Sequence, residues 1–243
     1  TRNSQGLVTG ISETKNGNTQ NLLTSAQYVP FGGAKSFTLG NGKTQTNTHN
    51  LNGQVASINV DEVYQSTLTY NADSQITALA SSLASASNQS FSYDELDRLT
   101  EATGTYGTLA YSYDSASNRI SKTTPSGTST LDYVTNSNQL NNSFTHDANG
   151  NRTKDSTHTY TYGEHNRLTE VVNEKSGITT TYLYNGLGQR VKKSNVYGDV
   201  YFIYDEQGLL IAEANGLGKV TTEYIYFEGQ PLVMLVGSSD GLL

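Results

Sequence analysis

The chain has 243 residues and a formal charge of -7, and only 15% of its residues are charged. A chain of this length can bury a sizeable core, and it lacks the basic stripe typical of nucleic-acid binders, so nucleic acid is not expected as a partner. The absence of cysteine excludes disulfides and thiolate metal sites, and the longest apolar run, residues 232–236, is too short to span a membrane.

Tyrosine and small polar residues dominate the composition. The chain holds 17 tyrosines, 23 glycines and only 3 prolines, and Ser, Thr and Asn are abundant. Aromatic and β-branched residues favour strands, whereas Gly and Asn favour turns. The composition therefore predicts an all-β fold rather than a disordered segment. No signal peptide opens the sequence, which begins in mid-pattern, so we expect a fragment of a longer protein.

A motif with two aromatic residues separated by one residue returns about every 20 residues along the chain. Two short strands and two turns need roughly 20 residues, so each copy is predicted to be one β-hairpin with its connection to the next. Residues 1–243 are thus predicted to form a single fragment, one long antiparallel meander of tandem hairpins. In chain order the copies stand at residues 49–54, 68–71, 91–99, 111–119, 131–133, 144–152, 160–168, 182–190, 202–210 and 224–226.

Each part of the motif has a predicted structural role. The aromatic pair lies on one face of a strand, and rings of neighbouring copies are predicted to stack into ladders. The Asp or Asn that follows, with a Gly, Asn or Asp a few positions later, favours an Asx-bonded turn with one residue at positive φ. The arginines are predicted to stack on rings or to pair with turn carboxylates. The motif residues are Tyr93, Asp94, Arg98, Tyr113, Asp114, Arg119, His146, Asp147, Gly150, Arg152, Tyr162, Arg167, Tyr184, Gly188, Arg190, Tyr204, Asp205, Gly208 and Tyr226.

Two segments depart from the regular meander. Residues 76–86 are rich in Ala, Ser and Leu, and they are predicted to form either a short helix or an irregular insertion. Around Gln139 to His146 the repeat step shortens to about 13 residues, which leaves room for a tighter hairpin.

The residue between the paired aromatics changes along the chain. It is Ser or Thr in the early copies, whereas the last three copies have Leu183, Ile203 and Ile225. We therefore expect the early sheet to be solvated on one face and the C-terminal sheet to be covered on both.

Tyr-Asp-x-x-Gly-Asn-Arg and Tyr-Asp-x-x-Gly-Arg-Leu at this spacing resemble the Rhs, or YD-repeat, family, over residues 28–236. That family includes bacterial polymorphic toxins, cocoon-forming subunits of insecticidal toxin complexes and animal teneurins. The resemblance implies a secreted or cell-surface protein whose curved or spiralling sheet forms part of a hollow shell around a C-terminal toxin or other cargo. Residues 224–243 resemble the start of the core segment that plugs the shell. The aspartates with which many members cleave themselves would lie beyond Leu243.

The resemblance implies that the fragment is a structural shell segment without enzymatic activity. Its implied partners are the remainder of the same polypeptide, including the core plug and the cargo. An adhesion module is the alternative, because exposed tyrosines flanked by Asn and Asp can bind sugars, so cell-surface glycans or a protein would then be partners. An incomplete strip also leaves open sheet edges, which predict self-association.

Three constellations could carry chemistry instead. The oxygen-bearing side chains of Asp147, Asn149 and Asn151 have the spacing that opens a calcium loop, but Arg152 and His158 stand where such a loop needs Gly and Glu, which favours an ordinary turn. Three histidines close in sequence could bind a metal or act as a base. Carboxylates in the turns could form a glycoside-hydrolase pair, although solvated acids are ordinary in turns. The histidines are His146, His158 and His165, and the acids are Asp94, Glu95, Asp97, Asp114 and Glu164. No catalytic, cofactor-binding or metal-binding residue is predicted.

Overall fold

The computed structural model describes the chain except for residues 16, 31, 82–87, 135–136, 142–143 and 238–243. The chain divides into two compact units, Thr1–Leu131 and Asp132–Leu243. The first unit contains a 12-stranded sheet and the second a 10-stranded sheet, and in each sheet the strands pair in chain order without a crossover. The predicted all-β meander of hairpins is confirmed. That residues 1–243 act as a single fragment stays a prediction.

The strands of the first unit are β1 Ile11–Lys15, β2 Asn18–Tyr28, β3 Ala34–Leu39, β4 Thr44–His49, β5 Val55–Val60, β6 Tyr64–Tyr70, β7 Ile76–Ala80, β8 Gln89–Tyr93, β9 Leu99–Gly104, β10 Gly107–Tyr113, β11 Arg119–Thr124 and β12 Gly127–Thr130. Those of the second unit are β13 Thr145–His146, β14 Arg152–Lys154, β15 His158–Tyr162, β16 Leu168–Asn173, β17 Thr179–Tyr184, β18 Arg190–Asn195, β19 Gly198–Tyr204, β20 Leu210–Asn215, β21 Val220–Phe227 and β22 Gln230–Val236.

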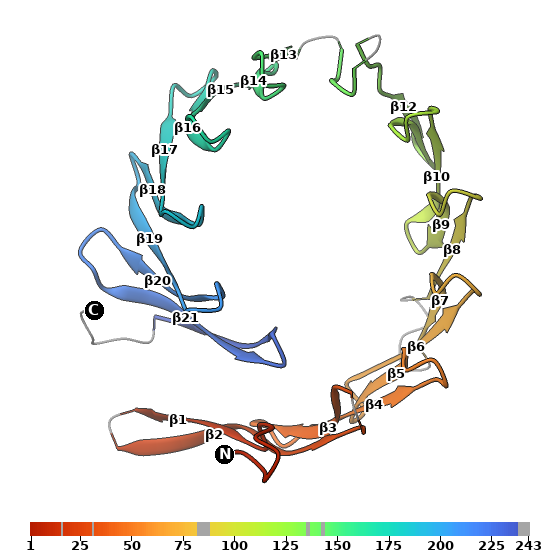
Figure 1. Ribbon diagram of the computed structural model, residues 1–243, viewed down its shortest axis with the longest axis vertical. Helices are drawn as coiled ribbons and strands as arrows, with labels where there is room; N and C mark the ends of the chain where they lie inside the picture. The colour runs from red at the N-terminus through yellow and green to blue at the C-terminus, as the bar shows by residue number, and fades with distance from the viewer. Residues whose placement is uncertain (16, 31, 82–87, 135–136, 142–143, 238–243) are drawn as a thin grey trace. The chain divides into compact units, whose positions relative to one another are not determined.

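Each sheet is a single layer. The extensive strand contacts are all between chain neighbours, and within each unit the strands follow one another along a bent band (Figure 1). Few side chains are therefore fully shielded from solvent. The buried apolar residues are Leu22, Leu23, Ala26, Ala34, Phe37, Ala102, Ala212, Ala214, Val220 and Phe227. Most strand residues are half-buried by their neighbours on the same face.

The helix predicted within residues 76–86 is wrong for the part of it that the structure describes. Ile76–Ala80 forms strand β7, in which Ile76 pairs with Tyr70 and Leu79 pairs with both Leu68 and Gln89. Pairing on both sides outweighs the helical preference of the alanines, because a short isolated helix is only marginally stable. Residues 82–87 lie outside the described residues. Before His146, an isolated antiparallel bridge joins Tyr133 to Leu140. The tighter hairpin expected around residues 139–146 stays a prediction, because residues 142–143 lie outside the described residues.

The predicted contrast between the two sheet faces is confirmed in part. The residues between the rings of early copies, such as Ser92 and Ser112, are exposed, and the rings beside them are half-buried. The prediction that the C-terminal sheet is covered on both faces is wrong for Leu183, which is 59% exposed. Ile203 and Ile225 are only half-buried. In a single-layered sheet, these side chains are covered only by neighbours in the same layer.

Candidate functional site at the repeat junctions

Most repeat hairpins close through a turn organised by an Asp or Asn. In the turn that Asp94 opens, Oδ1 of this residue accepts the N–H groups of Leu96 and Arg98, both at 3.0 Å. The Asp94 N–H donates to the Arg98 carbonyl at 3.0 Å, and Asp97 has a φ of 62°. The predicted turn, with Asx bonds and one residue at positive φ, is thus confirmed here. The same pair of Asx bonds organises the turns opened by Asn50, Asn71, Asp114, Asp147, Asn185 and Asp205.

In most of these turns, the residue four positions after the Asx has a complementary side chain, although Leu209 in the Asp205 turn has none. Where Asp opens the turn, this residue donates to the second carboxylate oxygen, and where Asn opens it, a Gln accepts from the Asn amide. The donors to Asp are Arg98, Asn118 and Asn151, and the acceptors from Asn are Gln54, Gln75 and Gln189. Sequence reasoning missed this pairing, although Asn recurring with Gln at that spacing signals it.

A β-bulge adjoins each of these repeat turns. Tyr93 pairs with Leu99 while Ser92 pairs with Glu101, so Thr100 is the extra residue on the second strand. The Thr100 hydroxyl donates to the Ser92 carbonyl at 3.1 Å and satisfies an acceptor at the irregularity. Bulges increase local twist and redirect side chains, so this one helps to aim the repeat tyrosine toward the preceding hairpin.

The repeat tyrosines connect consecutive hairpins through their hydroxyl groups. Tyr113 donates to the carbonyl of Leu99, the first residue after the preceding turn, at 2.7 Å. This bond ties the end of β10 to the start of β9. The same link joins Tyr70 to Val55, Tyr93 to Ile76, Tyr184 to Leu168, Tyr204 to Arg190 and Tyr226 to Leu210, over 2.7 to 3.0 Å. Sequence reasoning predicted ring ladders and missed these bonds, which need the register between hairpins.

The repeat arginines stack on rings as predicted, and they do so in two ways. Arginines five residues after the repeat tyrosine reach forward: Arg98 lies 4.8 Å from the ring centroid of Tyr113, and Arg167 lies 5.9 Å from that of Tyr184. Arginines one position later fold back onto a ring of their own hairpin. These are Arg119 on Tyr111, Arg152 on Phe144 and Arg190 on Tyr182, and Arg190 also lies over Phe202 of the following hairpin.

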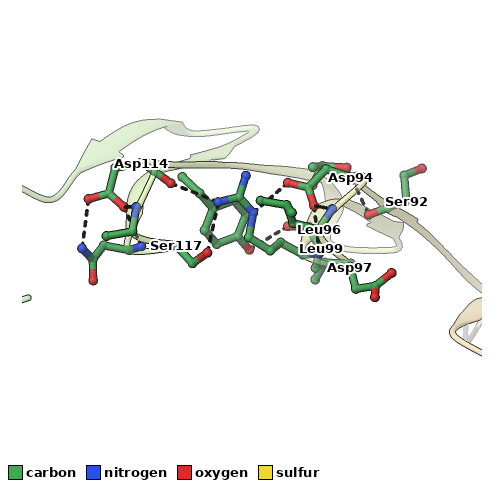
Figure 2. A network of polar contacts seen from close by, with 12 residues as sticks. Ser92, Asp94, Leu96, Asp97, Leu99, Asp114 and Ser117 are labelled. Atoms are coloured by element: carbon green, nitrogen blue, oxygen red, sulfur yellow. Dashed lines mark hydrogen bonds and ion pairs between the residues drawn. The ribbon is translucent and has the colours of Figure 1, made fainter. Parts of the chain in front are cut away.

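The Arg98 side chain bonds to two turns, and its partners Asp94, Asp114 and Ser117 are labelled in Figure 2. Its Nε donates to Asp94 Oδ2 at 2.8 Å, and its Nη1 reaches the Asp114 carbonyl at 3.0 Å and Ser117 Oγ at 3.4 Å in the next turn. Because the same guanidinium also lies over Tyr113, one side chain joins two turns and a ring. The junction is therefore a structural site, built to hold one hairpin against the next.

The residues considered for a calcium loop form an ordinary repeat turn, and the histidines considered for a metal site do not form one cluster. Asp147 Oδ1 accepts two backbone N–H groups and its Oδ2 accepts the Asn151 amide, as in an ordinary repeat turn. His158 contacts Thr157 and Asn173, and His165 lies in the turn after Tyr162. Over the part of the chain that is described, no group of three or more His, Cys, Asp or Glu side chains is arranged to hold a metal ion.

Two of the carboxylates considered for glycoside hydrolysis, Asp94 and Asp114, serve as turn caps. Hydrogen bonds from the backbone and side chain of Arg98 lower the pKa of Asp94, and the Asn118 amide lowers the pKa of Asp114. A hydrolase of this type needs one acid whose pKa is raised so that it stays protonated. Both shifts have the opposite sign, so the pair does not fit that mechanism.

These shifts predict how stability depends on pH. Asp94, Asp114 and Asp147 have pKa values below the ordinary 3.8, so their hydrogen bonds stabilise the fold fully above about pH 4 and progressively less as the pH falls through the lowered values. We expect the urea midpoint of unfolding to fall between pH 4 and pH 2. The triple variant Asp94→Asn, Asp114→Asn, Asp147→Asn should show a shallower fall, because amides do not titrate. An equal slope in both proteins would contradict this assignment.

The geometry defines a class of protein, a tandem β-hairpin repeat whose hairpins are joined by tyrosine and arginine side chains. Residues 93–129 match the family model described as RHS Repeat. The chain is also 35% identical over 94 residues to the tRNA3(Ser)-specific nuclease WapA of Bacillus spizizenii, a match that covers 37% of this chain and 4% of that protein. These matches, together with the repeat geometry, support the predicted resemblance to the Rhs, or YD-repeat, family.

Solved structures show the same fold. The Tc holotoxin pore of Photorhabdus luminescens with a TccC3 mutation aligns with a TM-score of 0.68 at 15% identity, and TcdB2-TccC3-TEV aligns with a TM-score of 0.69 at 14% identity. Each alignment covers 96% of this chain and 17% of the other. The chain therefore corresponds to a small part of these relatives. None of its described segments forms a helix that could cross a membrane.

Proposed function

We propose that this chain is a wall segment of a hollow shell that encloses a C-terminal toxin or other cargo of a longer polypeptide. The observation that carries the proposal is the single-layered sheet, in which side chains on both faces stay half-exposed. Such a sheet suits a wall that separates an inside from an outside. The fold shared with the TccC3 structures supports this role.

The repeat rings also favour a wall. Their hydroxyl groups are bonded to the backbone of the preceding hairpin, and arginines lie against several of them. An adhesion surface needs rings that are free on one side, so this arrangement does not favour the alternative of glycan or cell-surface binding. We further propose that the protein is secreted or displayed at a cell surface. Residues 224–243 as the start of a core segment, and association through open sheet edges, stay predictions.

Protease protection tests the shell. In the longer polypeptide that the proposal requires, the segment after residue 243 should resist a broad-specificity protease while the shell is intact. Deleting residues 1–131, the first unit, should open the wall and let the protease digest that segment. A control with the exposed change Lys35→Ala should keep the protection. Equally fast digestion in the intact and deleted proteins would overturn the proposal.

A further inference from the structure

The turn after Tyr162 is opened by Gly163, where the sister turns have Asp or Asn. Its backbone closes in the same way. The Gly163 N–H donates to the Arg167 carbonyl at 2.9 Å, the Asn166 N–H donates to the Gly163 carbonyl at 3.0 Å, and Asn166 has a φ of 54°. The turn thus keeps the geometry of its sisters without the side chain that organises them.

The groups that bind the carboxylate in a sister turn are present here. In the Asp94 turn, the carboxylate accepts the N–H groups of Leu96 and Arg98 and the Arg98 Nε. The equivalent donors are the N–H groups of His165 and Arg167 and the Arg167 guanidinium. Among the contacts of the described residues, none of these three donors has a hydrogen-bond acceptor, and Arg167 forms no ion pair.

The Arg167 guanidinium reaches forward to the next hairpin. It lies against the backbone of Gly188 and 5.9 Å from the centroid of the Tyr184 ring, and Arg167 lines the same hollow as His165. A guanidinium and two backbone N–H groups are a strong combination for a carboxylate, since hydrogen bonds with charged partners on both sides are roughly twice as strong as neutral ones.

A hollow of about 360 Å³ opens at this turn, within the size range of small-molecule sites. Besides the turn residues, Tyr182, Leu183 and Tyr184 line it, and Leu183 is 59% exposed. Glu164 also lines the hollow. A carboxylate at this position is compatible with a second one in the turn, because Glu95 holds the equivalent position directly after Asp94.

We propose that the Gly163 turn binds a small organic carboxylate, whose two oxygens take the places that the Asp94 carboxylate has in its own turn. The tyrosine rings and the apolar wall of the hollow suit a ligand whose carboxylate is attached to a compact ring, as in a sugar acid. This site is separate from the shell role, because its donors depend on one turn and not on what the sheet encloses.

Amide chemical shifts test the site directly. In the isotopically labelled chain, titration with sodium glucuronate should shift the His165 and Arg167 amide signals saturably, whereas glucose should not. Sodium acetate should shift the same signals only at a higher concentration, because it has the carboxylate but lacks the sugar ring that contacts the hollow. The Leu96 and Arg98 amides are the internal control, since Asp94 already occupies them. No saturable shift at residues 165 and 167, or an equal shift with glucose or at the Asp94 turn, would overturn the proposal.

Two variants sharpen the test. Gly163→Asp should supply the carboxylate from within the chain and abolish the response to glucuronate. A new Cβ would lie 3.2 Å from Thr169 Cγ2, but Asp94 and Thr100 coexist at the equivalent positions of a sister hairpin, so the variant should fold. Arg167→Gln removes the charge while leaving the turn backbone intact, and it should weaken binding about tenfold. Glucuronate binding that is unchanged in both variants would contradict the assignment.

Discussion

Replacing Arg98 with alanine should lower the free energy of unfolding of the first unit by about 2 kcal/mol. The stacking of its guanidinium on Tyr113 contributes roughly 1 kcal/mol, and the hydrogen bond to the Asp114 carbonyl contributes roughly as much. The ion pair with Asp94 adds little, because both side chains are partly exposed. Urea unfolding monitored by circular dichroism measures the change, and hydrogen exchange should show that β8–β11 lose protection first.

The matched controls separate the junction from a general loss of charge. Lys35→Ala, at an exposed position of the same unit, should change the unfolding free energy by less than about 0.5 kcal/mol. Arg98→Lys keeps the positive charge but lacks the planar guanidinium with its several N–H donors. It should therefore recover less than half of the stability that Arg98→Ala loses. If Arg98→Ala costs no more than Lys35→Ala, the forward contact of this arginine does not hold the hairpins together.

Truncating Tyr184 should destabilise the second unit by about 3 kcal/mol in the alanine variant and about 1 kcal/mol in the phenylalanine variant. The phenylalanine variant loses only the 2.7 Å hydrogen bond to the Leu168 carbonyl. The alanine variant also loses the ring on which Arg167 lies. Equilibrium urea unfolding of the two variants gives both values, and their difference isolates the ring from the hydroxyl.

Tyr197 serves as the control for this pair, because it is 82% exposed. Tyr197→Ala should change the unfolding free energy by less than about 0.5 kcal/mol. A Tyr184→Phe variant as stable as the parent would mean that the Leu168 carbonyl is equally well bonded by water. The links between hairpins would then come from the rings alone.

Much of the fold could be predicted from the sequence because its determinants are local. Alternating aromatics specify a strand face, and Asp94 with Asp97 specifies a turn, since each effect acts over a few residues. Repetition of that pattern leaves little choice but a meander of hairpins. The segment at residues 76–80 escaped this reasoning, because its composition suits a helix and only pairing with β6 and β8 makes it a strand.

The sequence by itself therefore determined the all-β class, the hairpin unit, the turn residues and the family resemblance. Only the tertiary structure decided which hairpin each Tyr hydroxyl and each Arg contacts and that Leu183 is exposed. It also decided that the donors of the Gly163 turn have no acceptors among the residues that the structure describes. The physical reason is the distance along the chain over which each interaction acts. Turn and strand preferences act within one hairpin, whereas the Tyr113 and Arg98 contacts depend on the register and bulge that align two hairpins.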